Sequence, residues 1–360
     1  MQQNPETTKI PILGITLGDP NGISYELLLR TFEDSKIFHF FIPVVYGSGK
    51  AIYYHKNLLK QQKFSYQNIQ EIDQAQANRV NFIECGQGFE RVEIGKPSKT
   101  AGIVAYNSLS RAVAHAQTNL ISAIVTLPIN KAAIQSDDFN FPGHTEYLTQ
   151  AFQSTDSLML MVYENLRIAT VTGHIPLKQV SESININTIL SKIQILHQSL
   201  RTDFWIDNPK IAVLGLNPHA GDSGLLGNEE LEVIIPAIEK ANQKNWLVFG
   251  PYSADGFFAS GQYLKFDAIL AMYHDQGLIP FKTIAQGNGV NFTAGIPVIR
   301  TSPDHGTAFN LAGKGVAKKD SFLNAIWLAI DILRKRTESN ILYSNPLKTV
   351  LPVEVLQEDE

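Results

Sequence analysis

Short apolar runs that end in polar or glycine-containing clusters recur along this chain, and they constrain its fold more than any other feature. The runs include Ile10 to Thr16, Ala123 to Leu127, Arg167 to Val171, Ile211 to Leu216 and Ala268 to Met272. Most have the length and continuous apolar character of a strand that is buried on both faces. Segments with helical spacing, such as 101–117 and 189–200, separate them. Strands that alternate with helices predict an α/β protein with a largely parallel sheet.

Length and composition limit the class of protein. The 360 residues leave room for a large core and, as a prior, for two domains. Hydrophobic residues make up 44% and charged residues 18%, which is typical of a globular enzyme. The formal charge of −4 is spread along the chain, so nothing indicates a nucleic-acid or membrane surface. With a single cysteine, no basic and apolar leader and no apolar run of roughly 18 residues, we expect a cytoplasmic protein.

Three of the predicted strands run into a polar turn that carries a histidine, namely His174, His219 and His274. The carboxyl ends of parallel strands meet at one edge of a sheet, so the three imidazoles would share that edge. A single histidine at a strand end is more often structural, but three in one register predict a metal site. In the turn expected at 273–277, Asp275 could be a fourth ligand, a partner that orients a ligand, or a proton acceptor.

A second cluster follows within the stretch from Phe266 to Gly315. Lys282, Asn291 and Arg300 come at intervals of nine residues, each beside apolar residues. A buried charge is costly unless it is paired, so the two cations are predicted to hold anionic groups of a ligand. The alternative is that each pairs with a distant carboxylate. The turn at 304–308 contains glycine among polar residues, which lets backbone N–H groups approach a phosphate or a nucleotide.

These motifs resemble those of the 4-hydroxythreonine-4-phosphate dehydrogenase family of pyridoxal phosphate biosynthesis, over nearly the whole chain. They are PGHTE at 142–146, VTGHIPL at 171–177, GLNPHAG at 215–221, YHDQGL at 273–278 and RTSPDHGTA at 300–308. The resemblance implies an isocitrate/isopropylmalate dehydrogenase-like fold, with two α/β domains around a central cleft. We expect residues 1–135 and 300–360 to form the domain on the cofactor side. Residues 136–299 would form the domain on the metal and dimerisation side.

The resemblance also implies a role for each cluster. The residues implied to bind a divalent metal (zinc, magnesium or cobalt) are His174, His219 and His274. Those implied to bind the substrate are His144, Thr145, Lys282, Asn291 and Arg300. Those implied to bind NAD or NADP, in a segment that resembles the adenine-side loop of decarboxylating dehydrogenases, are His305, Gly306, Thr307 and Gly313. The catalytic proton acceptor is left open among Asp275, Asp255 and Lys282.

The implied reaction is the oxidation of 4-(phosphooxy)-L-threonine to 2-amino-3-oxo-4-(phosphooxy)butanoate, which decarboxylates to 3-amino-2-oxopropyl phosphate. The metal would lower the pKa of the substrate alcohol and then polarise the new ketone. The family also implies a homodimer whose active sites draw residues from both subunits. We expect neither a nucleic acid nor a membrane as a partner.

Two positions depart from the family pattern, and other functions stay open. Ser24 stands where glycine is usual, and SADG at 253–256 replaces the more usual PADT, which leaves the role of Asp255 less certain. Relatives act on other phosphorylated hydroxy acids, such as 4-phosphoerythronate, and the shared motifs do not choose between substrates. A metal-dependent hydrolase or aldolase could use the same histidines, but it has no need of a dinucleotide loop. A non-catalytic binding protein would leave the polar strand ends unexplained.

Overall fold

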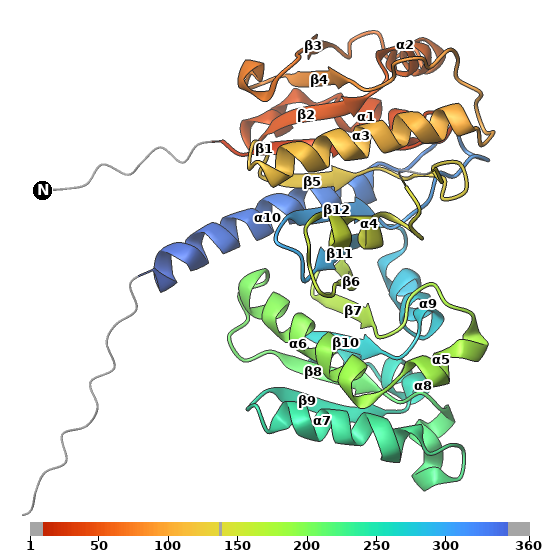
Figure 1. The fold of residues 1–360 in the computed structure, drawn as a ribbon, viewed down its shortest axis with the longest axis vertical. Helices are drawn as coiled ribbons and strands as arrows, with labels where there is room; N and C mark the ends of the chain where they lie inside the picture. The colour runs from red at the N-terminus through yellow and green to blue at the C-terminus, as the bar shows by residue number, and fades with distance from the viewer. Residues whose placement is uncertain (1–9, 137–138, 345–360) are drawn as a thin grey trace, which may run out of the picture.

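One continuous sheet of twelve strands forms the centre of the computed structural model, which describes residues 10–136 and 139–344 (Figure 1). From one edge to the other, the strands are β3 (Tyr66–Asn68), β4 (Val80–Glu84), β2 (Ile42–Gly47), β1 (Ile12–Thr16), β5 (Ala123–Thr126), β12 (Ile299–Pro303), β11 (Val290–Ala294), β6 (Leu158–Tyr163), β7 (Leu166–Thr170), β10 (Ala268–Ala271), β8 (Lys210–Leu214) and β9 (Leu247–Tyr252). The α/β fold class predicted from the sequence is confirmed.

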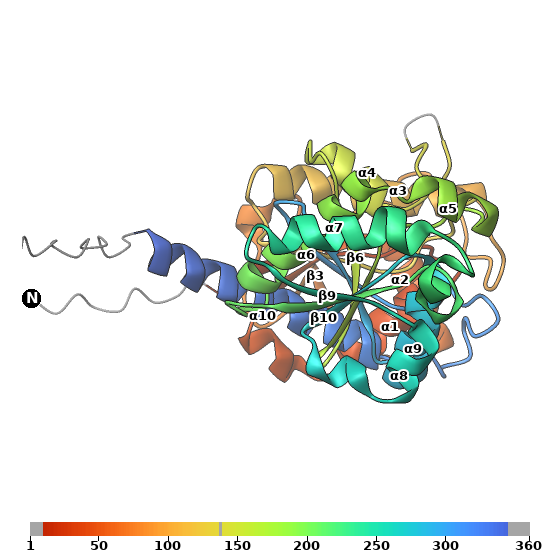
Figure 2. The same cartoon turned by 90° about the horizontal axis from the view of Figure 1, so that it is seen from below.

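Two blocks of parallel strands make up this sheet. The first block runs from β3 to β12, and the second contains β7, β10, β8 and β9. Between them, β11 pairs antiparallel with β12 and with β6, and β6 forms an antiparallel hairpin with β7. The sheet is therefore largely parallel with an antiparallel junction. Figure 2 looks along the row of strands and shows their directions turning, as a twist of roughly 20–25° per strand requires.

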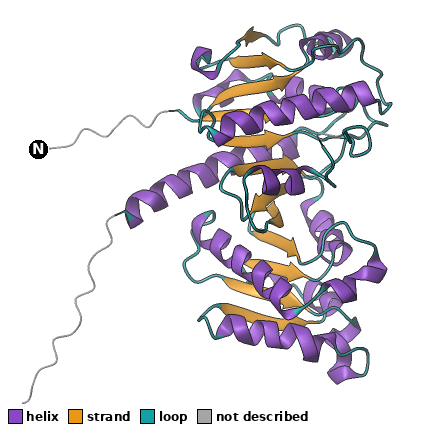
Figure 3. Ribbon diagram, in the orientation of Figure 1, coloured by secondary structure: helices purple, strands orange, loops and turns teal. Residues whose placement is uncertain are grey.

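Helices cover both faces of the sheet (Figure 3). They are α1 (Ser24–Thr31), α2 (Gly49–Leu58), α3 (Lys99–Gln117), α4 (His144–Ala151), α5 (Val180–Ser183), α6 (Ile186–Thr202), α7 (Ile235–Asn242), α8 (Ala254–Ala259), α9 (His274–Ala285) and α10 (Asp320–Tyr343). Neighbouring residues on β2 enter different cores, Val45 that of α1 and α10 and Val44 that of α3. Burial on both faces explains why the strands read as continuous apolar runs.

The predicted domain division falls within the sheet rather than between two sheets. Strands β1 to β5 and all of β12 except Ile299 come from 1–135 and 300–360, and β6 to β11 come from 136–299. Hydrogen bonds between β11 and β12 carry the sheet across this division, and the two domains stay a prediction. The C-terminal turns of α10 extend away from the sheet (Figure 1). None of the helices in the described part of the chain is long and apolar enough to span a membrane.

Close packing of α3 on the loop after β5 generates a prediction about stability. A Cβ on Gly102 would lie 1.9 Å from the carbonyl oxygen of Ala133, which belongs to backbone and cannot rotate away. We expect Gly102→Ala to lower the free energy of unfolding by at least about 1–3 kcal/mol, measured by urea denaturation. The matched control is Gly256→Ala in α8, where a Cβ would meet nothing within 4 Å. That control should be neutral or stabilising by up to about 1 kcal/mol. Equal stabilities of the two variants would contradict the packing argument.

Candidate active site

A pocket of about 240 Å³ lies where the two blocks of the sheet meet. Its walls come from the ends of β5 and β12, from β6 and β11, from the loop after β7 and from α4 and α9. Twist across the antiparallel junction explains how strand ends from both blocks reach one cavity. The predicted site residues that line it are His144, Thr145, His174, His274, Lys282, Asn291, Arg300, His305 and Gly306.

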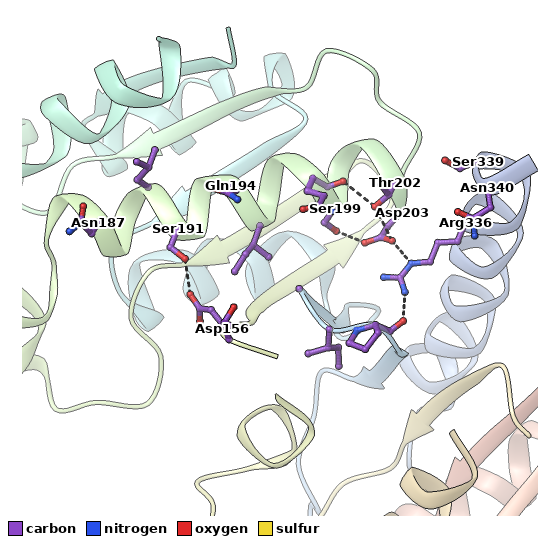
Figure 4. A pocket seen from close by; sticks show the side chains of 17 residues that line it. Asp156, Asn187, Ser191, Gln194, Ser199, Thr202, Asp203, Arg336, Ser339 and Asn340 are labelled. Carbon is purple, nitrogen blue, oxygen red and sulfur yellow. Dashed lines mark hydrogen bonds and ion pairs between the residues drawn. The ribbon is translucent and has the colours of Figure 1, made fainter. Parts of the chain in front are cut away.

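A larger groove of about 700 Å³ lies between α6 and the C-terminal part of α10 (Figure 4). Its charged side chains already have partners. Asp203 pairs with Arg336 at 2.6 Å, and Asp156 pairs with Lys192 at 2.6 Å. Ser199 donates a further hydrogen bond to Asp203, also at 2.6 Å. The groove offers a charged ligand no uncompensated partner among the described residues, so the smaller pocket is the better candidate.

Arg300 is the buried cation of the pocket. The residue is only 3% exposed. Its guanidinium donates hydrogen bonds to the hydroxyls of Thr126 on β5 and Thr293 on β11, at 2.7–3.2 Å. No carboxylate of the described residues lies within 4 Å of it, as the sequence predicted. Burial lowers the pKa of the guanidinium to about 10, while the charge of Glu146 acts in the opposite direction. A desolvated charge among neutral hydroxyls is a strong candidate for an anion site.

Several buried polar atoms around Arg300 also have no partner in the described residues. They are Nε2 of His144, Nε2 of His305 and Oδ1 of Asn291. Burial lowers the pKa of both histidines, and for His144 the charges of Arg300 and Lys131 act in the same direction. Neutral imidazoles and an amide can each donate or accept a hydrogen bond. Unsatisfied groups of this kind, gathered in one cavity, indicate a polar ligand.

His174 and His274 face each other in the pocket with ring centroids 5.4 Å apart. They follow β7 and β10, which are neighbours in the sheet and parallel. Residues 273–277 do not form the turn that was expected there, because His274 is already the first residue of α9. Its Nδ1 bonds Oδ1 of Asp275 at 2.7 Å, which orients the ring. Burial, followed by the charges of Lys131 and His274, lowers the pKa of His174 and favours the neutral form that binds metals.

His219 follows β8, the strand next to β10, but it does not line the pocket. The chain here adopts left-handed backbone angles over five residues, with φ of 54° at His219 and 52° at Ala220. Such angles cost roughly 1–2 kcal/mol for each residue other than glycine. Within the described residues, no group of three His, Cys, Asp or Glu side chains is placed to hold a metal. The shared edge predicted from the sequence therefore brings two of the three histidines together.

Glu230 holds the left-handed turn in place. It is buried at the start of a π-helical segment, η5 (Glu230–Ile234), that precedes α7. One carboxylate oxygen accepts from the backbone N–H groups of Leu216 and Asn217, both at 2.7 Å. The other accepts from the side-chain amide of Asn217 at 2.9 Å. Charge-assisted hydrogen bonds of this kind hold the turn in one conformation, so the strained backbone angles persist.

Of the three candidates for the proton acceptor, only Lys282 lines the pocket in the described residues. Asp255 and Asp275 lie outside the pocket lining. Asp275 is exposed beside His274, and Asp255 is exposed in the first turn of α8. A hydrogen bond from Ser253 lowers the pKa of the Asp255 carboxyl, and His219 contributes in the same direction. His219 and Asp255 thus form a second group, apart from the pocket of the same chain.

The segment predicted to bind the dinucleotide meets the pocket at one end only. His305 and Gly306 line the pocket, and a Cβ on Gly306 would meet nothing within 4 Å, so its backbone is open to a ligand. The carbonyl oxygen of Thr307 instead accepts from the N–H of Ile23 at 3.0 Å. Gly313 has a positive φ of 75° and packs near Leu58 and Ile94.

Three charged residues of the pocket, Lys131, Glu146 and Asp304, were given no role from the sequence. Lys131 comes from the loop after β5, and Glu146 comes from the first turn of α4. A signal was available for both. Lys131 ends the polar cluster that follows a predicted strand, and Glu146 belongs to the motif PGHTE beside His144 and Thr145.

Known proteins are similar to this chain in sequence and in fold. The family model of the pyridoxal phosphate biosynthetic protein PdxA matches residues 39–329. A 4-hydroxythreonine-4-phosphate dehydrogenase of Bacteroides thetaiotaomicron is 47% identical, with 95% of this chain and 94% of that protein covered. A D-threonate 4-phosphate dehydrogenase of Cupriavidus necator is 37% identical, with 91% and 98% covered. The crystal structure of 4-hydroxythreonine-4-phosphate dehydrogenase from Klebsiella pneumoniae is 34% identical and has a TM-score of 0.78, with 91% and 99% covered.

The hydrogen bonds of Glu230 generate a prediction for the turn at His219. In Glu230→Gln, an amide NH₂ must replace one acceptor oxygen and face either a backbone N–H or the amide of Asn217. We expect a loss of about 1–3 kcal/mol in the free energy of unfolding, and faster amide hydrogen exchange over 216–224. Glu232→Gln, at an exposed position two residues along, is the control and should change neither measurement. Unaltered exchange in Glu230→Gln would mean that something else holds the turn.

Proposed function

The chain belongs to the PdxA family of pyridoxal phosphate biosynthetic proteins, and on this premise we propose that it oxidises 4-(phosphooxy)-L-threonine. The product, 2-amino-3-oxo-4-(phosphooxy)butanoate, would then decarboxylate to 3-amino-2-oxopropyl phosphate. The observation that carries this proposal is the guanidinium of Arg300, which is buried at the pocket with no carboxylate of the described residues as its partner. A phosphorylated amino acid supplies the anions that this cation lacks.

Two cations divide the anionic groups of the substrate between them. Arg300 presents a planar fork that matches a carboxylate or a phosphate, and Lys282 lies across the pocket on α9. The ammonium of Lys282 is 3.3 Å from the carbonyl oxygen of Asp304 and forms no ion pair within 4 Å in the described residues. His144, Thr145 and Asn291 supply neutral donors and acceptors beside them. These residues bind the substrate and hold its reacting carbon in one orientation.

A divalent ion, zinc, magnesium or cobalt, fits the side of the pocket that carries His174 and His274. Their donor set is two imidazoles, one of them oriented by a carboxylate through its other ring nitrogen. His219 is the third ligand that we propose. When bound, such an ion lowers the pKa of an alcohol and polarises a ketone. Of Lys282 and Arg300, the one that binds the phosphate would keep the substrate in place while its carboxylate leaves as carbon dioxide.

The distribution of the site residues supports a homodimer with shared active sites. His219 and Asp255 lie together but apart from the pocket of their own chain. We propose that they complete the pocket of a second subunit. Asp255 and Asp275 are then the candidates for the proton acceptor, because Lys282 cannot accept a proton while it holds an anion as an ammonium. The dinucleotide, NAD or NADP, accepts a hydride when bound, and His305 and Gly306 with Thr307 and Gly313 of the same loop are the residues proposed to hold it.

A second candidate function is supported by a named relative. The protein of Cupriavidus necator is a D-threonate 4-phosphate dehydrogenase. The cations of the pocket suit any phosphorylated hydroxy acid, 4-phosphoerythronate included. What separates these compounds from 4-(phosphooxy)-L-threonine is the amino group, which carries a positive charge at neutral pH.

The proposed anion site is tested with phosphorylated and dephosphorylated forms of the substrate. We expect Arg300→Lys and Lys282→Ala each to lower kcat/KM, because loss of one charge contact typically costs about 2–5 kcal/mol, or roughly 30-fold to several-thousand-fold. The variant of the residue that binds phosphate should lose this factor only with the phosphorylated compound. Arg336→Lys, which changes an ion pair in the groove beside α10, is the control and should retain activity. Equal losses of kcat/KM on both compounds in both variants would show that neither residue binds the phosphate.

The proposed metal site is tested by binding and by subunit mixing. Titration calorimetry with cobalt or zinc should show weaker binding by His174→Ala, His219→Ala and His274→Ala than by the wild type. His197→Ala should bind normally, because His197 stacks on Trp246 in another part of the molecule.

If the active sites are shared, two inactive variants should complement each other. After subunit exchange between His174→Ala and His219→Ala, half of the dimers are hybrids with one intact site, which predicts roughly a quarter of wild-type activity. No recovery after proven exchange would place the three histidines in one chain, and full metal binding by all three variants would remove the site.

A further inference from the structure

The side chain of Gln276 links the ends of two strands that precede histidines. Its Oε1 accepts a hydrogen bond from the backbone N–H of Met272, the residue after β10, at 2.7 Å. Its Nε2 donates to the backbone carbonyl oxygen of Gly215, the residue after β8, at 2.6 Å. His274 follows Met272 closely in the chain, and His219 follows Gly215. One side chain is therefore bonded to the backbone shortly before each of two histidines.

This link begins where the backbone ladder between the two strands ends. Strands β10 and β8 pair in parallel over 268–270 and 211–213, so neither Met272 nor Gly215 belongs to their ladder. The N–H of Gly215 instead donates to the carbonyl oxygen of Tyr252, on the other neighbouring strand, β9, at 2.8 Å. A side-chain amide offers the same N–H and C=O groups as a peptide bond. The amide of Gln276 thus continues the connection between β10 and β8 beyond the last backbone pair.

Gln276 itself is held firmly, because the first turn of α9 packs directly on the sheet. The helix begins at His274, so this histidine and Gln276 belong to one helical turn. At Gly277, a Cβ would lie 3.0 Å from a side-chain atom of Ile168 on β7 and 3.1 Å from that of Ala271 on β10. Such close approach leaves the turn little room to shift. The amide is therefore a fixed spacer between the two strand ends.

The strand end on the other side of β10 has a link of its own. The N–H and the hydroxyl of Thr172 both donate to the carbonyl oxygen of Met272, at 3.1 and 2.8 Å. Thr172 comes shortly before His174 in the chain. The ends of β7 and β10 are thus joined independently of Gln276. Among the hydrogen bonds of the described residues, the amide of Gln276 makes the corresponding link towards β8.

Gln276 is placed to position other residues rather than to contact a ligand. It does not line the pocket, and both ends of its amide are bonded to backbone groups. The backbone before His219 is held from two sides, because Gln276 binds the carbonyl oxygen of Gly215 and Glu230 accepts from the N–H of Leu216 at 2.7 Å. The start of the strained turn is therefore fixed relative to α9.

We propose that Gln276 is a positioning residue that fixes the turn carrying His219 relative to His274, and so the geometry of the proposed metal ligands. The inference rests on the proposed function. In a dimer with shared sites, one chain gives His274 to its own pocket and His219 to the pocket of the second subunit. The link through Gln276 would then connect the two sites of the dimer. Residues that orient metal ligands without touching the metal typically contribute roughly 10- to 100-fold to metal affinity.

The test removes the two hydrogen bonds of Gln276 separately in the full-length protein. Gln276→Glu keeps an acceptor for Met272 but has no N–H for the carbonyl oxygen of Gly215, whereas Gln276→Met has neither group. We expect both variants to bind cobalt roughly 10- to 100-fold more weakly than the wild type in titration calorimetry. In the metal-free protein, amide hydrogen exchange should be faster over 216–219 in both variants, and faster at Met272 only in Gln276→Met. Gln194→Glu and Gln194→Met, at an exposed position of α6, are the matched controls and should change neither measurement.

The outcomes separate this inference from the proposed function. A residue with only a structural role would lower stability and leave cobalt affinity unchanged, so wild-type affinity in Gln276→Glu overturns the inference while the metal site stands. Weaker binding with unaltered exchange over 216–219 also overturns it, because the turn has then not moved. If the wild type binds no cobalt, the proposed metal site fails and the inference fails with it. Unchanged exchange over β1 and β2, in the other block of the sheet, shows that a variant is folded, and if one variant does not fold the other decides.

Discussion

The antiparallel junction formed by β12, β11 and β6 is the constraint on which the rest of the structure depends. It joins two blocks of parallel strands, and the strands of one block run in the opposite direction to those of the other. Because each strand is twisted relative to its neighbour, the blocks are rotated enough for the ends of β5, β12, β7 and β10 to border one cavity. Without the junction, a fully parallel sheet would line up its carboxyl ends along one edge and leave them spread over its length.

The junction also determines the electrostatics of the pocket. Arg300 on β12 lies between Thr126 of β5 and Thr293 of β11, so its guanidinium is desolvated by the sheet itself. The hydroxyls satisfy part of its hydrogen-bonding capacity but none of its charge. A protein can retain such a group only if the free energy lost by burying it is recovered elsewhere, and a bound anion recovers it. Beside it, buried polar atoms of His144, His305 and Asn291 have no hydrogen-bond partner among the described residues. A ligand with polar groups as well as an anionic group would satisfy them.

The backbone is strained at the turn after β8. Five consecutive residues have left-handed backbone angles from His219 onward, His219 does not line the pocket of its own chain, and the carboxylate of Glu230 holds the backbone directly before the turn. Backbone strain of this kind persists only where the surroundings over-determine it, and it gathers at functional sites. A pocket with two of the three imidazoles proposed to bind metal, and a separate turn carrying the third, are what a site divided between subunits would require.

The sequence by itself determined the α/β class, the positions of β1, β5, β7, β8 and β10, the placement of His174 and His274 directly after strands, and the absence of an acidic residue close before Arg300 in the chain. These follow from local pattern, because buried strands need apolar runs and because a cation amid apolar residues has few partners nearby. Only the tertiary structure decided that β11 lies antiparallel between β12 and β6, that residues 273–277 start a helix, and that His219 and Asp255 lie apart from the pocket. Only it showed that Lys131 and Glu146 line the same pocket. These features depend on long-range pairing, on the twist summed over many strands and on a turn held by Glu230, none of which leaves a local signal in the chain.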